Sequence, residues 1–250
     1  ICMLKKIIAL GAGAFFSINV FATEDPYAPA LPQVWSSIII VSGGPAWSNP
    51  GKDQYLYPFP PPQNNYYIAD SKSDWLGTGG IFFGLQHFIG ASDVIGQFGL
   101  GVAAASDASL SGTVGVNGVP DVYTYQYKVS HVRAEFKGKL VACGFQTLQP
   151  YLSGSFGVGW NHAHDWTPTT IDPVLYPTYW FTTASTMAFS YTLGAGVQKM
   201  LTPNWQLGVG AEFADWGKNY LGGDGATLNQ GPGMPHLYTT ALMFSIGYMY

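Results

Sequence analysis

Apolar side chains alternate with small or polar ones along most of this chain. The C-terminal segment shows the pattern most clearly, because a large apolar residue occupies every second position. These residues are Leu242, Phe244, Ile246, Tyr248 and Tyr250. A period of two is that of a β-strand with two unlike faces, one large and apolar and the other small. We therefore expect strands whose two faces meet different surroundings.

Composition indicates what those surroundings are. Hydrophobic residues make up 47% of the chain and charged residues only 10%, against roughly 25% charged residues in an ordinary soluble domain. No segment after residue 22 approaches the roughly 20 consecutive apolar residues of a membrane-spanning helix. Contact with lipid would then be spread over alternate residues of strands. Only a closed barrel allows this, because lipid offers no partner to an unpaired backbone amide.

About eight segments carry the strand pattern, and the connections between them alternate between long and short. The predicted strands are 34–43, 76–88, 93–105, 122–138, 150–162, 186–199, 205–218 and 236–250. The predicted long connections are 45–75, 106–121, 163–183 and 219–235, and the shortest ones are 89–92 and 202–204. Long extracellular loops and short periplasmic turns are typical of bacterial outer-membrane barrels. The sequence therefore predicts an all-β, eight-stranded antiparallel up-and-down transmembrane β-barrel.

The N-terminal region predicts secretion. Lys5 and Lys6 precede an uncharged, largely apolar run that closes at Ala22. A basic start, a short apolar stretch and a small-residue exit are the features of a cleaved signal peptide. We expect 1–22 to be that peptide, 23–33 to be a short periplasmic segment and 34–250 to form a barrel in the outer membrane.

Charged residues on the predicted inward face are the candidates for the chemistry of the barrel interior. They are Lys128, Arg133, Glu135, Lys137, Glu212 and Lys218, with Gln198 on the same face. Charges in a narrow lumen are costly unless they are paired, and a barrel of about eight strands leaves an interior that side chains can fill. We expect a structural charge network that plugs the barrel, and a narrow nonspecific pore is the alternative.

Aromatic residues are predicted to face the lipid and its interfaces. They are Phe83, Tyr123, Tyr127, Trp160, Phe189, Tyr191, Trp205, Phe213, Tyr248 and Tyr250. If Tyr123 and Tyr127 point outward while Arg133 points inward, the strand must change phase between them. We therefore expect a β-bulge near Ser130.

Two short motifs have the residue types of catalytic or metal sites. His162, His164 and Asp165 could bind a metal or act as acid and base, but no third metal ligand follows at a recognised spacing. Ser130 and His131 could serve as nucleophile and base in a lipid-modifying enzyme, but adjacent strand residues point to opposite faces. We predict no enzyme activity, no metal and no cofactor.

Several of these features together resemble a known family. The signal peptide, the glycine-alternating strands, the run 213–218 (Phe-Ala-Asp-Trp-Gly-Lys) and the aromatic C-terminus are similar to small outer-membrane β-barrel proteins. These are the opacity-type or porin-family surface antigens of gram-negative bacteria, with an OmpA-like transmembrane domain. The resemblance covers 34–250 and implies architecture rather than activity, because the family shares no catalytic motif. It also implies that Phe244, Ile246, Tyr248 and Tyr250 form an assembly signal, although that signal usually ends in Phe.

The expected role is structural and interactive. We expect the barrel to support membrane integrity and its loops to contact host or neighbouring surface molecules. The partners would be outer-membrane lipid and lipopolysaccharide, the barrel-assembly machinery and host surface molecules. A formal net charge of −4 argues against nucleic acid, because there is no basic stripe to neutralise phosphates. The alternatives are the narrow pore and, third, a lipid-modifying barrel enzyme.

Overall fold

The computed structural model describes residues 35–58, 64–89, 93–144, 148–171 and 179–250. The predicted signal peptide and periplasmic segment lie outside these residues. The described residues form twelve strands: β1 (Ser36–Ser48), β2 (Gln54–Leu56), β3 (Asn65–Ala69), β4 (Trp75–Phe88), β5 (Val94–Val116), β6 (Val119–Ala142), β7 (Gln149–Thr170), β8 (Ala184–Met200), β9 (Trp205–Asp215), β10 (Asn219–Gly222), β11 (Gln230–Met234) and β12 (Tyr238–Met249). In this described part, no helix is long and apolar enough to cross a membrane.

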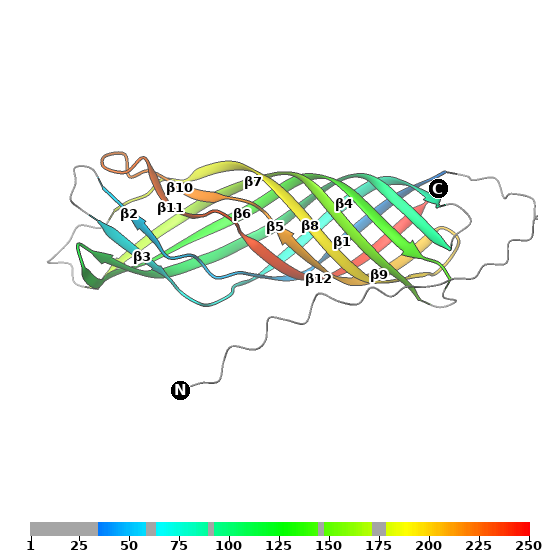
Figure 1. The fold of residues 1–250 in the computed structure, drawn as a ribbon, viewed down its shortest axis with the longest axis horizontal. Helices are drawn as coiled ribbons and strands as arrows, with labels where there is room; N and C mark the ends of the chain where they lie inside the picture. Colours follow the sequence, from blue (N-terminus) through cyan, green and yellow to red (C-terminus); the bar gives the residue numbers. More distant parts are fainter. Residues whose placement is uncertain (1–34, 59–63, 90–92, 145–147, 172–178) are drawn as a thin grey trace, which may run out of the picture. The chain divides into compact units, whose positions relative to one another are not determined.

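Eight of the strands pair into a closed antiparallel ring (Figure 1). Around the ring the order is β1, β4, β5, β6, β7, β8, β9 and β12. The ring closes where β12 pairs with β1, with Ile38 opposite Met249. At the end of this seam Ser37 and Tyr250 exchange two backbone hydrogen bonds, each of 3.1 Å. The predicted eight-stranded antiparallel barrel is confirmed.

The two ends of the ring differ in their connections. β1 begins and β12 ends at the same end, which we call the near end and which also holds the short connection 201–204. The opposite end, the far end, holds the long connections with β2, β3, β10 and β11 (Figure 1). This is the alternation of long and short connections that the sequence predicts.

All four of the predicted long loops contain strand residues, and 106–121 consists almost entirely of them. β5 and β6 run on through 106–121 and turn only at Asn117 and Gly118, where φ is 48° and 83°. Two consecutive positive φ angles are those of a two-residue hairpin turn whose twist matches its strands. β7 continues to Thr170, so the predicted loop 163–183 begins late. The predicted loop 45–75 contains β2 and β3, and β3 pairs with the far part of β5.

These far-end strands form a structure beyond the ring, which we call the extension. It comprises β2, β3, the far parts of β5 (from Ala108), β6 (to Val129) and β7 (from Ala163), and the β10–β11 hairpin in the predicted loop 219–235. The loop prediction for 106–121 is wrong, because the Gly and Ser residues that commonly favour turns do not form one here. Here they occupy strand positions, and Ala108, Leu110 and Val114 between them are buried.

The predicted change of phase near Ser130 is also wrong. Along β6 the odd-numbered residues from Tyr123 to Glu135 are all buried, and Thr124, Gln126, Val132 and Ala134 between them are exposed. A pairing irregularity does lie opposite Ser130, but the extra residue is on β5, because Ala105 pairs with His131 and Ala108 with Val129. The other irregularities of the β6 pairings lie between Val114 and Val116 on β5 and between Gln126 and Lys128. Tyr123 and Tyr127 therefore point inward, with 0% and 3% of their surfaces exposed.

The reason is an inversion of polarity between the ring and the extension. Outside the ring, large apolar side chains are exposed, including Leu100 at 68% and Phe189 at 65%. Outside the extension, Thr124, Gln126 and Thr167 are exposed, while tyrosines and other apolar residues fill its interior. An apolar strand face thus points outward in one part of β6 and inward in the other without any bulge on β6 itself.

The ten aromatic residues that were predicted to face outward fall into three groups. Phe83, Trp160, Phe189, Trp205, Tyr248 and Tyr250 are exposed, as predicted. Tyr191 and Phe213 are half-buried and pack against each other with ring centres 6.3 Å apart. Tyr123 and Tyr127 belong to the interior of the extension.

Candidate functional site: the barrel lumen

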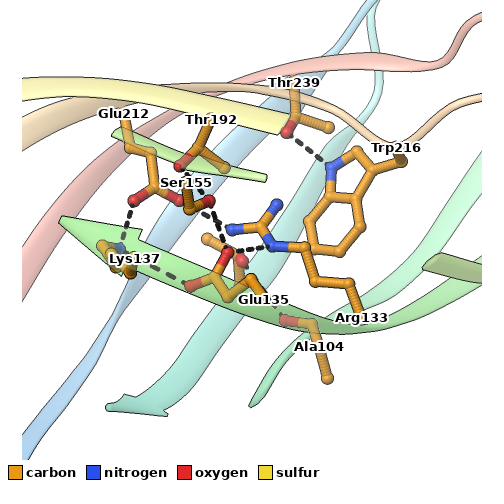
Figure 2. Close-up of polar contacts among 10 residues, drawn as sticks. Ala104, Arg133, Glu135, Lys137, Ser155, Thr192, Glu212, Trp216 and Thr239 are labelled. Carbon is orange, nitrogen blue, oxygen red and sulfur yellow. Dashed lines mark hydrogen bonds and ion pairs between the residues drawn. The ribbon is translucent and has the colours of Figure 1, made fainter. Parts of the chain in front are cut away.

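A cluster of four charged side chains lies in the lumen. Alternation along β6 places Arg133, Glu135 and Lys137 on its inward face, and β9 presents Glu212 to them. Arg133 Nε lies 2.7 Å from Glu135 Oε2, and Arg133 Nη2 lies 3.1 Å from Glu212 Oε1. Lys137 Nζ lies 2.9 Å from Glu212 Oε2 and 3.8 Å from Glu135 Oε1. Two cations and two anions form a closed ring of ion pairs (Figure 2).

Neutral side chains hold this cluster in place. Ser155 donates a hydrogen bond of 2.7 Å to Glu135 Oε2 and lies 2.6 Å from the Thr192 hydroxyl. The guanidinium of Arg133 lies 4.3 Å from the centre of the Trp216 ring, and the Trp216 indole donates to Thr239 at 2.9 Å (Figure 2). A guanidinium that stacks on an aromatic face and bonds to carboxylates satisfies most of its requirements without water.

Two residues predicted for this network lie elsewhere. Lys128 points outward from β6 and forms an ion pair of 3.2 Å with Asp165, with both side chains substantially exposed. Lys218 is exposed beyond the end of β9. Lys128 was assigned to the lumen together with the phase change that β6 does not make, because an even-numbered residue there cannot share a face with Arg133.

One buried lysine of the lumen is not among the predicted charged residues. Lys139 continues the odd-numbered series of β6 and has only 9% of its surface exposed. Its ammonium donates to Gln198 Oε1 at 2.5 Å and lies 4.0 Å from the centre of the Tyr151 ring. The spacing of two from Lys137 would have revealed it.

An aromatic core fills the interior on the far side of the charges. It includes Tyr67, Tyr123, Tyr125, Trp166 and Phe181, all buried in one cluster. The Tyr67 and Tyr123 hydroxyls lie 3.2 Å apart. Burial raises the pKa of Tyr123 to about 12 and raises that of Tyr67 as well, because phenolate would lose its hydration there. The interior of the extension is therefore a packed core.

A smaller apolar cluster fills part of the near half of the lumen. Ile38, Ile40, Phe82 and Met249 are buried together, and Met200 packs against them. A cavity of about 60 Å³ lies in this half and is lined by residues that include Lys137, Lys139 and Glu212. The charge cluster thus has packed side chains on both sides.

The enzyme-like motifs are not assembled into sites. Ser130 is half-buried on the outer side, whereas His131 is 1% exposed and bonds to Asn161 at 2.8 Å. His162 and His164 stack on the outer surface, where His162 contacts Ser185 and His164 contacts Asp107. Within the described ranges, no group of three or more His, Cys, Asp or Glu residues could hold a metal ion.

The predicted assembly signal lies on the outer face of the closing strand. Phe244, Ile246 and Tyr248 are exposed between β9 and β1, and Tyr250 is 68% exposed. The ring of Tyr248 lies 4.9 Å from that of Trp205 and 6.4 Å from that of Tyr250. Recognition of these residues during assembly stays a prediction.

No protein-family model and no curated protein sequence matches the chain. Among solved structures it is similar to Neisserial surface protein A, with a TM-score of 0.44 and 11% identity over 87% of this chain and 100% of that one. It is also similar to the outer membrane protein OprG from Pseudomonas aeruginosa (TM-score 0.42, 14% identity, 86% and 96% covered). A third is the outer membrane protease OmpT from Escherichia coli (TM-score 0.41, 10% identity, 86% and 97% covered). The fold assigned above rests on the strand pairing of the chain itself.

Glu212 provides a test of the charge cluster. Glu212→Gln keeps the shape of the side chain but leaves Arg133 and Lys137 with one carboxylate between them. We expect a loss of about 3–5 kcal/mol in the free energy of unfolding, the usual cost of breaking a buried pair from one side. Urea unfolding of the refolded protein in detergent measures it. Asp165→Asn removes an exposed pair and serves as the control, with little change expected. Equal effects of the two changes would contradict a buried network.

Proposed function

We propose that this protein is an integral outer-membrane barrel with a closed lumen, which presents its extension to partners outside the cell. The observation that carries the proposal is the inverted polarity of the two parts. The outer wall of the ring is a belt of exposed apolar side chains, contributed by every one of its eight strands. The outer wall that β6 and β7 form in the extension carries polar side chains such as Thr124, Gln126 and Thr167. A wall that changes from apolar to polar along the barrel axis suits lipid below and water above.

The connections support one orientation. The near end has the short connections, the first residues of β1 and the last residues of β12. The far end has the extension. Outer-membrane barrels place short turns in the periplasm and long connections outside. Trp47 and Trp75 lie opposite each other on β1 and β4 and are both exposed where the ring meets the extension, as expected of aromatics at a membrane interface.

The packed lumen favours a structural barrel over a pore. The aromatic core, the charge cluster and the apolar near-end cluster fill successive parts of the interior. A barrel of about eight strands has an interior that side chains can fill completely. Its contribution would be to membrane integrity and to holding the extension rigidly above the surface.

Exposed tyrosines on the extension support a role in surface contact. Tyr55 and Tyr57 are 55% and 69% exposed, and the Tyr55 ring stacks on Tyr66 with centres 4.3 Å apart. Asp53 fixes this group, because it accepts hydrogen bonds from the Tyr66 hydroxyl at 3.2 Å and from the Ala69 amide at 2.8 Å. Tyrosine gives a large contact area at low entropic cost and is enriched at interfaces. The partners would be host surface molecules or lipopolysaccharide, and assembly would depend on the closing strand.

A single substitution that introduces a charge tests whether the belt of exposed apolar side chains faces lipid. Leu100→Arg places a cation in the middle of the belt and should cost about 2–4 kcal/mol in a bilayer. Gln126→Arg places the same cation on the outer wall of the extension and should change stability by no more than about 0.5 kcal/mol. Unfolding of both variants from phospholipid vesicles measures the difference. Similar costs at the two positions would argue against a membrane boundary between ring and extension.

Conductance separates the closed barrel from the pore. In planar bilayers the refolded protein should insert without a steady unit conductance, because packed side chains obstruct the lumen on both sides of its cavity of about 60 Å³. A protein shown to be folded by its heat-modifiable mobility on gels must be used. Stable conductance steps that scale with salt concentration would support the pore instead.

The surface role is tested on bacteria that display the protein. The double change Tyr55→Ser and Tyr57→Ser should reduce adhesion to a layer of cultured host cells several-fold, because it removes two exposed rings that stack on each other beside Tyr66. Surface amounts of folded protein should not change. Ile171→Ser, also at an exposed apolar position at the far end, is the control and should leave adhesion unchanged. If the double variant adheres as well as the wild type, Tyr55 and Tyr57 do not contribute to surface contact.

A further inference from the structure

The buried charges of the lumen do not balance. Arg133 and Lys137 pair with Glu135 and Glu212, two cations against two anions. Lys139 follows on the same face of β6 and is a third buried basic side chain. Among the described residues no carboxylate oxygen lies within 4.0 Å of its ammonium, and its contacts are the neutral Gln198 and the Tyr151 ring. A buried charge without a counter-charge is costly.

Lys139 lines a cavity in which several hydrogen-bond donors lie between apolar side chains such as Phe82 and Met243. The lining includes the ammonium groups of Lys137 and Lys139 and the hydroxyl-bearing side chains of Tyr151, Ser153 and Ser245. The carboxylate in this lining, Glu212, already accepts from Arg133 and Lys137. Apart from Glu212 and the amide oxygen of Gln97, which has no hydrogen-bond partner among the described residues, the polar groups of the lining can donate hydrogen bonds to an anion.

Glycines on β8 and β9 make room for this site. Gly196 and Gly210 face Tyr151, and a Cβ atom at either would lie within 2.7 Å of the tyrosine hydroxyl. Any other residue would therefore displace the ring on which the Lys139 ammonium rests. The cavity of about 60 Å³ is roomy for a monatomic ion, since by the same measure about 10–15 Å³ holds a water molecule.

We propose that this cavity binds one small monovalent anion of chloride size, held by the Lys139 ammonium and the surrounding hydroxyl groups. The anion supplies the counter-charge that the lumen lacks and completes the neutral interior. The site lies in the near half of the lumen, on the other side of the charge cluster from the extension. The anion site is separate from the surface of the extension. A failed test of the surface role would therefore leave the anion proposal unaffected, and the reverse also holds.

The first experiment measures stability in different salts at equal ionic strength. Thermal unfolding of the refolded protein is followed in sodium chloride, sodium bromide and sodium gluconate, whose anion is too large for the cavity. A ligand that binds only the folded state stabilises it in proportion to the logarithm of its concentration above Kd. We expect the midpoint to rise with chloride and bromide and not with gluconate.

Two lysine variants identify the site. Lys139→Met should remove the difference between chloride and gluconate. Lys199→Met, which removes an exposed lysine of β8, should retain it in full. A rise of equal size in all three salts would mean general screening and would overturn the proposal, as would a chloride effect that survives Lys139→Met.

A direct measurement covers the case in which Lys139→Met does not fold. Wild-type crystals grown in bromide should show an anomalous peak within hydrogen-bonding distance of Lys139 Nζ. A cavity that contains water alone in these crystals would overturn the proposal. So would a bromide peak without any salt-specific shift in the unfolding midpoint, because binding would then occur only at crystal concentrations.

Discussion

The structure depends on the pairing of its first and last ring strands. β1 and β12 join over the length of the seam, from Ile38 opposite Met249 to Ser48 opposite Thr239. Without that pairing the ring would be an open sheet with two edges of unsatisfied amide and carbonyl groups. Such edges are very unfavourable in apolar surroundings, where water cannot replace the missing partners. Closure lets the outer wall of the ring be apolar throughout, and it also creates an interior that must be filled.

Closure also explains why the two parts of the barrel have opposite polarity. In the ring, the inward face is mostly small or polar apart from the cluster of Ile38, Ile40, Phe82 and Met249, and the outward face is large and apolar. In the extension, where the outer wall is polar, the interior must supply the hydrophobic core, and it does so with tyrosines and Trp166. β6 serves both parts with an uninterrupted alternation of side chains from Tyr123 to Val141. The chemical character of each face changes along the strand while its geometry does not.

The cluster of Arg133, Glu135, Lys137 and Glu212 lies toward the place where these two parts meet. Arg133 connects them directly, because it stacks on Trp216 at the edge of the aromatic core and forms ion pairs with Glu135 and Glu212 in the ring. Buried ion pairs contribute little net stability compared with apolar packing, but breaking one from a single side is costly. The cluster therefore favours one arrangement of the side chains in the lumen. Lys139, which has no carboxylate partner within the described part of the chain, is the exception on which the anion site rests.

The sequence by itself determined the strand periodicity, the eight-stranded closed barrel and the alternation of long and short connections, because a period of two and a shortage of charge leave few other solutions. It also identified Arg133, Glu135, Lys137 and Glu212, which the structure brings together. It could not determine which face of 122–130 is the inner one. Tyr123 and Tyr127 have the same pattern as a lipid-facing strand, and the prediction failed for them and for Lys128.

Only the tertiary structure decided that point, because it shows that β5, β6 and β7 continue beyond the ring and enclose a core of their own. Periodicity specifies that two faces differ. Which face is buried depends on whether lipid or water lies outside, and that depends on how far the strand extends past its neighbours in the ring.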